Sequence, residues 1–317
     1  MMKQIAIGCM VKNEGHIIER CLESILRLEP ELVVITDTGS SDNTIMKAGL
    51  FLQKHKIPFR IYQETFIDFA FNRSLLLKYI QQETNIDYVL MLDADDIIEY
   101  HPSYTKDTFR LQLVGQVYNV EYKDQYVTYH LPKLTSNKVD LSYIGVTHEY
   151  LHNLQYKEII LTGIWTRQFN DSFRRQNHTK HLNDIQLINK VLKTTVDNGL
   201  KARYYFYLGQ AYLAIGEIED AIKAYQQRIF LGGWPEEIFY SHYQLGKIYE
   251  TINMDKCVYH YIKAYLSCKH RAESLYNLQK YLEHNKMPIV SMMLNLFIKE
   301  IKCPISGLFL EPQKYGS

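Results

Sequence analysis

Two aspartates, Asp93 and Asp95, are separated by one residue and directly follow the apolar run 88–92. Closely spaced carboxylates at the end of a buried strand are suited to hold a hard divalent cation such as Mg²⁺ or Mn²⁺ beside bound phosphates. The pair alone is a weak signal, because the abundance of Asp yields about one such pair by chance in a chain of this length. The alternative is a turn in which these aspartates end the strand and cap the next element.

A second polar segment, 37–42, begins with Asp37 and follows the apolar run 32–36. By itself it is typical of a capped turn between a strand and a helix. In open α/β sheets, however, ligands bind beyond the carboxyl ends of the strands. If both apolar runs are strands of one parallel sheet, Asp37 and the aspartates at 93–96 face the same crevice.

The first hundred residues alternate short apolar runs with amphipathic stretches, which predicts βαβ units and a parallel sheet. Alternating, tyrosine-rich runs between 116 and 162 predict antiparallel strands added to that sheet. After Phe169 the pattern is helical. The expected parallel strands lie at 5–11, 32–36, 59–62 and 88–92, and the first and third helices at about 14–28 and 68–83.

The second half of the chain contains an internal repeat. Leu208-Gly209-x-x-Tyr212 recurs as Leu245-Gly246-x-x-Tyr249, at a spacing close to the period of about 34 residues of tetratricopeptide repeats, in which small residues permit close helix packing. An ordinary helical bundle is the alternative. We therefore expect two domains, an α/β domain over 1–169 and a helical linker with repeats over 170–317.

Composition excludes several classes of protein. The 36 basic and 35 acidic residues nearly cancel, so the chain has no overall electrostatic signature for binding nucleic acid or an anionic membrane. The five cysteines are scattered without a CxxC pair, which predicts reduced, buried thiols. No apolar run approaches the roughly 18 residues of a membrane span. We expect a cytoplasmic protein without an integral membrane segment.

Five motifs lie along the chain, at 9–14 (Cys-Met-Val-Lys-Asn-Glu), 37–42 (Asp-Thr-Gly-Ser-Ser-Asp), 68–73 (Asp-Phe-Ala-x-Asn-Arg), 93–96 (Asp-Ala-Asp-Asp) and 145–149 (Gly-Val-Thr-His-Glu). In this order they resemble the motifs of glycosyltransferase family 2 of GT-A fold. The last resembles a subgroup in which the catalytic domain is fused to tetratricopeptide-like repeats. The resemblance implies an α/β fold, with a GT-A catalytic domain (Rossmann-like, mainly parallel sheet) followed by an all-α helical repeat domain.

The resemblance assigns donor-binding roles to four residues. Asp37 would bind the uracil or its ribose, and Asp93 would contact the ribose and the metal shell. Asp95 would ligate the Mn²⁺ or Mg²⁺ that bridges the diphosphate, and Arg73 would reach the nucleotide. Such an ion neutralises the charge that develops on the leaving diphosphate.

Further candidates lie later in the chain. His148 is a candidate third metal ligand, with a hydrogen-bonded turn histidine as the alternative. Glu149 is the candidate general base that takes the acceptor's proton in an inverting transfer. A structural salt bridge remains open for Glu149, and Asp140 is the second candidate base. Arg174 and Arg175 are candidates for a mobile clamp over the diphosphate, the alternative being a solvated helix start.

The expected function is transfer of a sugar from a nucleotide donor, a UDP-hexose, to a protein, peptide or glycan acceptor. The repeats would hold the acceptor, because stacked helix pairs present an elongated surface. A sugar-phosphate nucleotidyltransferase is disfavoured, since residues 12–15 replace the glycine-rich phosphate loop that it requires. A non-catalytic repeat scaffold carrying an inactive transferase domain is the remaining alternative. The motifs depart from the family at Asp96, where Glu is common, and at Ser74, where Asn is common.

Overall fold

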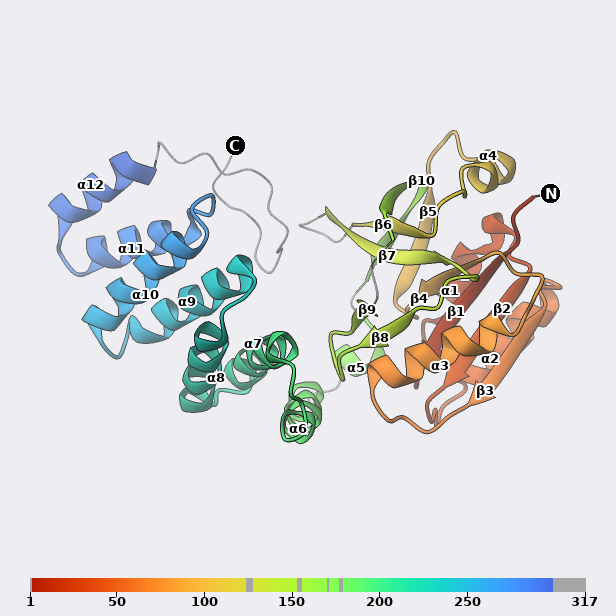
Figure 1. Cartoon of the computed structure of the whole chain (residues 1–317), viewed down its shortest axis with the longest axis horizontal. Coiled ribbons are helices and arrows are strands. Elements are labelled where there is room, and N and C mark those ends of the chain that lie inside the picture. Colours follow the sequence, from red (N-terminus) through yellow and green to blue (C-terminus); the bar gives the residue numbers. More distant parts are fainter. Residues whose placement is uncertain (1, 124–127, 153–155, 170, 177–178, 299–317) are drawn as a thin grey trace. The chain divides into compact units, whose positions relative to one another are not determined.

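The computed structural model of the chain comprises two compact units, Met1–Lys180 and His181–Ser317 (Figure 1). The sequence pattern changes nearby, between 169 and 170. The structure describes residues 2–123, 128–152, 156–169, 171–176 and 179–298.

The first unit is built on an eight-stranded sheet of order β3-β2-β1-β4-β7-β6-β10-β5. β1, β2, β3 and β4 form a parallel block, and β7 joins it antiparallel to β4. β8 and β9 form a separate antiparallel pair. The strands are β1 (Ile5–Val11), β2 (Leu32–Asp37), β3 (Phe59–Gln63), β4 (Tyr88–Leu92), β5 (Asp96–Tyr100), β6 (Val117–Lys123), β7 (Thr128–Ser136), β8 (Ser142–Ile144), β9 (Tyr150–His152) and β10 (Glu158–Gln168).

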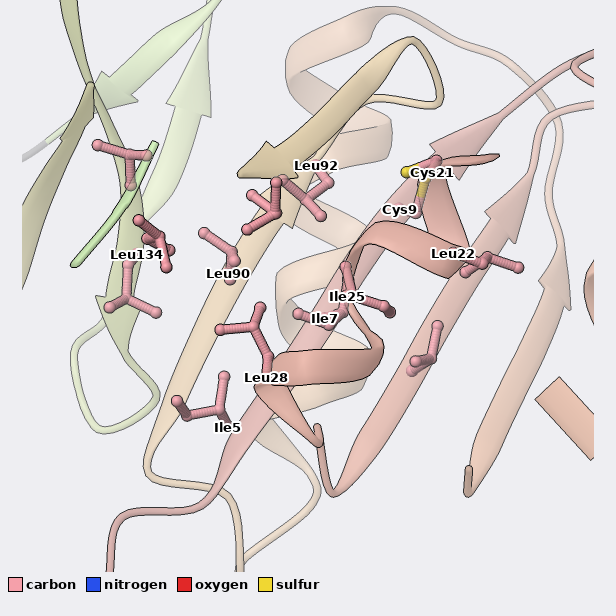
Figure 2. Close-up of a cluster of buried hydrophobic side chains, with 14 of the residues drawn as sticks. Ile5, Ile7, Cys9, Cys21, Leu22, Ile25, Leu28, Leu90, Leu92 and Leu134 are labelled. Carbon is pink, nitrogen blue, oxygen red and sulfur yellow. The ribbon is translucent and has the colours of Figure 1, made fainter. Parts of the chain in front are cut away.

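Helices cover both faces of this sheet, so its central parallel strands β1, β2 and β4 are buried except at the partly buried Met10, as expected for a parallel sheet. α1 (Ile18–Ser24), the 3-10 turn η1 (Leu26–Leu28), α2 (Thr44–Lys54) and α4 (Lys106–Leu111) share one apolar core with the sheet. Figure 2 shows side chains of α1 and η1 against those of β1 and β4 in this core. α3 (Phe69–Gln81) and the β8–β9 pair contribute to the core on the other face.

The first helix is shorter than the predicted span of 14–28. Asn13 has a φ of 57°, in the left-handed region that does not continue into a helix. The carbonyl of Glu14 then accepts the amides of Ile17 and Ile18 at 3.0 and 2.8 Å, so 14–17 forms a turn. The predicted third helix is confirmed as α3, whose amino end is capped by the Asp68 carboxylate accepting the Phe71 amide at 2.7 Å.

In the described part of the second unit, all regular secondary structure is helical. Consecutive helices pack as pairs, α7 with α8, α9 with α10 and α11 with α12. The predicted fold class, an α/β domain followed by an all-helical region, is confirmed. The helices are α6 (Lys180–Leu192), α7 (Asn198–Ala214), α8 (Ile218–Leu231), α9 (Pro235–Tyr249), α10 (Met254–Ser267), α11 (Glu273–His284) and α12 (Pro288–Ile298).

The repeated Leu-Gly-x-x-Tyr pattern corresponds to a repeated helix contact. A Cβ added at Gly209 of α7 would lie 2.6 Å from the Tyr225 ring of α8, and one at Gly246 of α9 would lie 2.7 Å from the Tyr261 ring of α10. Both distances are shorter than van der Waals contact, so each glycine permits a helix to approach a tyrosine ring. The assignment of these pairs to the tetratricopeptide class stays a prediction.

Four cysteines fall in the described part of the chain, and all four are buried and free of disulfides, namely Cys9, Cys21, Cys257 and Cys268. Within the same residues, every helix is too short or too polar to span a bilayer.

Candidate active site

The carboxyl ends of β1, β2 and β4 bring the predicted donor-binding residues to one edge of the sheet. β1 lies between the other two strands, with Val11 paired to Asp37 of β2 and Cys9 paired to Leu92 of β4. Asp37 is the last residue of β2, and Asp93 follows β4 directly. Because neighbouring parallel strands end at the same side, the two polar segments share the edge at which ligands bind in such sheets.

The loops after β1 and β2 are joined by hydrogen bonds. The Asn13 amide donates to Ser40 Oγ at 2.9 Å, and the Ser41 amide donates to Asn13 Oδ1 at 2.7 Å. The Gly15 amide donates to Asp42 Oδ2 at 3.0 Å. The two loops therefore form one hydrogen-bonded unit at this edge of the sheet.

Asp37 lies directly before the second of these loops and is buried. Its Oδ1 accepts the amide of Ser40, three residues further on, at 3.0 Å, and this local side-chain-to-backbone hydrogen bond stabilises the turn after β2. The turn uses one carboxylate oxygen and fixes the direction of the other.

Asp93 is held between two cations. One carboxylate oxygen pairs with the Arg73 guanidinium of α3, and Oδ2 lies 3.2 Å from Nζ of Lys133 in β7. Burial would raise the pKa of Asp93, but Arg73 and then Lys133 stabilise its charged form and hold the pKa well below its usual range. Lys133 is a site residue that the sequence analysis did not identify.

Arg73 also pairs with Glu149, so one guanidinium bridges two carboxylates. Its side chain is only 9 % exposed. Burial alone would lower the pKa of Arg73, and the charges of Asp93 and Glu149 raise it well above its usual value. The salt bridge that sequence analysis left open for Glu149 is present, and the role of Glu149 as a base stays a hypothesis.

Asp96 supports the turn that carries Asp93 and Asp95. It is fully buried, and its Oδ2 accepts the Asp93 amide at 3.1 Å and the Tyr122 hydroxyl at 2.9 Å. Burial, and secondly the negative charge of Asp93, raise the pKa of Asp96 to about 7. A buried carboxyl that receives two hydrogen bonds fixes the backbone from which its two neighbours project.

The predicted metal ligands are not gathered into a three-ligand group. Among the described residues, one group of three His, Cys, Asp or Glu side chains has its ligand atoms within 4.8 Å of one another. This group lies in the helical unit and contains none of Asp93, Asp95 and His148. His148 is exposed, on a turn with a φ of 52°. The carboxylate of Asp95 still fits a hard cation, because Mg²⁺ in such sites is bound by one or two carboxylates together with substrate phosphates and water.

The segment 171–176 crosses to the loop after β1 within the first unit. Arg20 of α1 binds the Asp171 carboxylate through two nitrogens, both at 2.7 Å. The Phe173 amide donates to Glu14 Oε2 at 3.1 Å. Burial is the main cause that raises the pKa of Glu14 to about 7, and the charge of Asp95 contributes. These hydrogen bonds therefore hold the segment 171–176 beside the turn that contains Asp95.

Arg174 lies in the segment 171–176, within α5 (Phe173–Gln176). Its guanidinium carbon is 4.3 Å from the centre of the Phe69 ring, and its NH2 is 3.3 Å from Thr147 Oγ1. Arg174 is thus placed beside the 145–149 segment and the start of α3. The side chain of Arg175 falls outside the described part of the structure.

Comparison with known proteins gives one family and weakly similar relatives. Residues 7–103 match the family model described as Glycosyl transferase family 2. The SPbeta prophage-derived glycosyltransferase SunS of Bacillus subtilis (strain 168) is 22 % identical over 231 residues, which are 69 % of this chain and 51 % of SunS. Glycosyltransferase SunS of Bacillus phage SPbeta gives the same figures. The chain thus spans about half the length of the curated relatives that it matches.

Two solved structures show only low similarity to this chain. S. aureus TarS 1-349 is 12 % identical, with a TM-score of 0.43 over 83 % of this chain and 91 % of TarS. The same protein in complex with UDP-GlcNAc is 13 % identical, with a TM-score of 0.41 over 99 % of each chain.

Proposed function

We propose, from the premise that residues 7–103 form a glycosyl transferase family 2 domain, that this chain is a metal-dependent, inverting glycosyltransferase. Its donor would be a nucleotide-sugar, a UDP-hexose, and its acceptor a protein, peptide or glycan. The observation that carries the proposal is the location of both Asp37 and the 93–96 turn at the carboxyl edge of the parallel sheet.

The proposal divides donor binding among four residues. Asp37 would accept a hydrogen bond from the uracil or ribose, and Asp95 would hold Mn²⁺ or Mg²⁺. When bound, such an ion would stabilise the diphosphate as it leaves. Arg73 and Lys133, which pair with Asp93 and Glu149 in this structure, would present N–H donors near the diphosphate. Donors held at fixed positions stabilise developing negative charge without reorganising.

Donor binding is tested by the melting temperature of the chain. Saturating UDP together with Mn²⁺ is expected to raise it by several degrees, because a ligand that binds only the folded protein stabilises it by RT ln(1 + [L]/Kd). UDP alone or Mn²⁺ alone should do much less if the ion bridges protein and diphosphate. ADP with Mn²⁺ is the matched control for uracil recognition. Equal shifts with UDP in Mn²⁺ and in EDTA would refute the bridging ion.

The helical unit would hold the acceptor, since paired helices offer an extended surface. Exposed aromatic side chains suited to contact a sugar or peptide include Phe230, Trp234 and Tyr259. Replacing them with Ala is expected to weaken transfer to the acceptor and to spare hydrolysis of the donor, because the nucleotide would bind in the other unit. Parallel losses in both assays would show that these side chains only support the fold.

A further inference from the structure

Three side chains of types that bind transition metals meet in the helical unit. Glu236 lies in the first turn of α9, Cys268 directly follows α10, and His270 lies in the connection to α11. Cys268 Sγ is 3.4 Å from Glu236 Oε1 and 3.2 Å from His270 Nε2. The third side of the triangle, from His270 Nε2 to Glu236 Oε1, is 3.0 Å. One sulfur, one nitrogen and one oxygen therefore surround a common point.

The size of this triangle suits a zinc ion. Bonds of about 2.3 Å to sulfur and about 2.0–2.1 Å to nitrogen and oxygen, at tetrahedral angles, separate the ligand atoms by about 3.3–3.6 Å. The separations here, 3.0 to 3.4 Å, are shorter by a few tenths of an ångström. Small side-chain rotations would open the triangle to the required size, with no change in the helices.

The surroundings orient the carboxylate and balance the charge. Arg271 NH1 lies 2.8 Å from Glu236 Oε2, so the other oxygen, Oε1, faces the cysteine and histidine. Arg271 is itself paired with Glu273. A thiolate and a carboxylate together carry two negative charges, which a divalent ion neutralises. Such outer hydrogen bonds to a ligating carboxylate are the usual support of a metal site.

Access to the triangle is from the histidine side. Cys268 and Glu236 are 4 % and 6 % exposed, whereas the side chain of His270 is 42 % exposed. An ion held by the three side chains would keep a fourth position for water, as zinc sites with three protein ligands do. A thiolate with an imidazole selects zinc over Mg²⁺ or Mn²⁺, which prefer oxygen ligands.

We propose that Glu236, Cys268 and His270 form a zinc site that links the start of α9 to the α10–α11 connection. The site is independent of the proposed transferase function, whose ion would be bound by oxygen ligands in the first unit. The competing interpretation is a hydrogen-bonded cluster in which the thiol donates to Glu236 and no ion binds.

The test is a titration of the full-length, reduced and metal-stripped chain with Co²⁺, which substitutes for zinc and absorbs light. We expect one equivalent to produce a thiolate-to-cobalt charge-transfer band and the intense visible bands of a four-coordinate ion. Zinc should abolish both. Absence of the charge-transfer band would refute the site.

Variants assign the band to these side chains. His270→Gln, at a partly exposed position outside the helices, should weaken Co²⁺ and Zn²⁺ binding at least about tenfold, since loss of an outer-shell partner alone costs 10–100-fold. Cys268→Ala should remove the charge-transfer band. If His270→Gln binds both ions with unchanged affinity, the proposal is overturned. This result counts even if Cys268→Ala fails to fold. A folded Cys268→Ala protein that keeps the charge-transfer band would also overturn the proposal.

Matched controls exclude other ligands. His284→Gln changes an exposed histidine of α11, and Cys257→Ala changes a buried cysteine of α10. Asp95→Asn removes the candidate ligand of the first unit. All three should leave the band and its affinity unchanged, and loss of the charge-transfer band in Cys257→Ala would place the site elsewhere.

Discussion

Asp95→Asn is expected to abolish sugar transfer and to leave the fold intact. The substitution keeps the size of a side chain that is only 4 % exposed and removes the negative charge that would hold the divalent ion. Loss of one stabilising group for a developing anion typically costs about 10²–10³ in turnover, and loss of the ion should cost at least as much. Mass spectrometry of products from a panel of UDP-sugars measures the effect.

The control for Asp95→Asn is Asp107→Asn, the same change at an exposed aspartate of α4 in the same unit. It should leave transfer and the joint UDP and Mn²⁺ shift unchanged, whereas Asp95→Asn should lose both. An Asp95→Asn protein with full transfer activity would remove Asp95 from the metal assignment. A variant that lost activity together with its far-UV circular dichroism would report unfolding, and Asp95→Glu would then be the variant to compare for the recovery of folding and activity.

Glu149→Gln is expected to lower turnover by about two to four orders of magnitude if Glu149 is the general base. The amide keeps the shape of the side chain and cannot take a proton. The affinity for UDP should change little, because a base acts on the acceptor, and the acid limb of the pH–rate profile should disappear. Steady-state kinetics with a UDP titration separates the two effects.

The ion pair with Arg73 provides the competing outcome for Glu149. If Glu149 only positions Arg73, Glu149→Gln should weaken UDP binding and leave the pH profile in place. That result would move the search for the base to Asp140, which is exposed. Asp140→Asn is therefore the matched control, expected to retain turnover if Glu149 is the base.

Much of the parallel sheet was predictable from sequence because its strands are continuous apolar runs. The predicted runs 5–11 and 88–92 coincide with β1 and β4, and the run 32–36 stops one residue short of the end of β2. The strand β5 was not predicted. It begins at Asp96, within the polar motif, and its partner β10 lies far along the chain, so no local pattern indicates the pairing.

The candidate site was predictable only where it follows local motifs. Asp37 and Asp93 follow apolar runs, and this spacing indicated their common edge. Lys133 was missed because a single lysine in an alternating strand usually faces solvent, and its approach to Asp93 depends on the antiparallel pairing of β4 with β7. The burial of Asp96 and the pairing of Arg73 with Glu149 likewise depend on tertiary contacts.

The hydrogen bonds between the loops after β1 and β2 constrain the evolution of the chain. The amides of Asn13 and Gly15 are satisfied by side chains of Ser40 and Asp42, so neither loop is free to change alone. A substitution at Asp42 would leave the Gly15 amide without its acceptor, and an unsatisfied buried donor costs about 1–3 kcal/mol. Among relatives of this chain, residues 13–15 and 40–42 are therefore expected to change together, as covarying positions in an alignment.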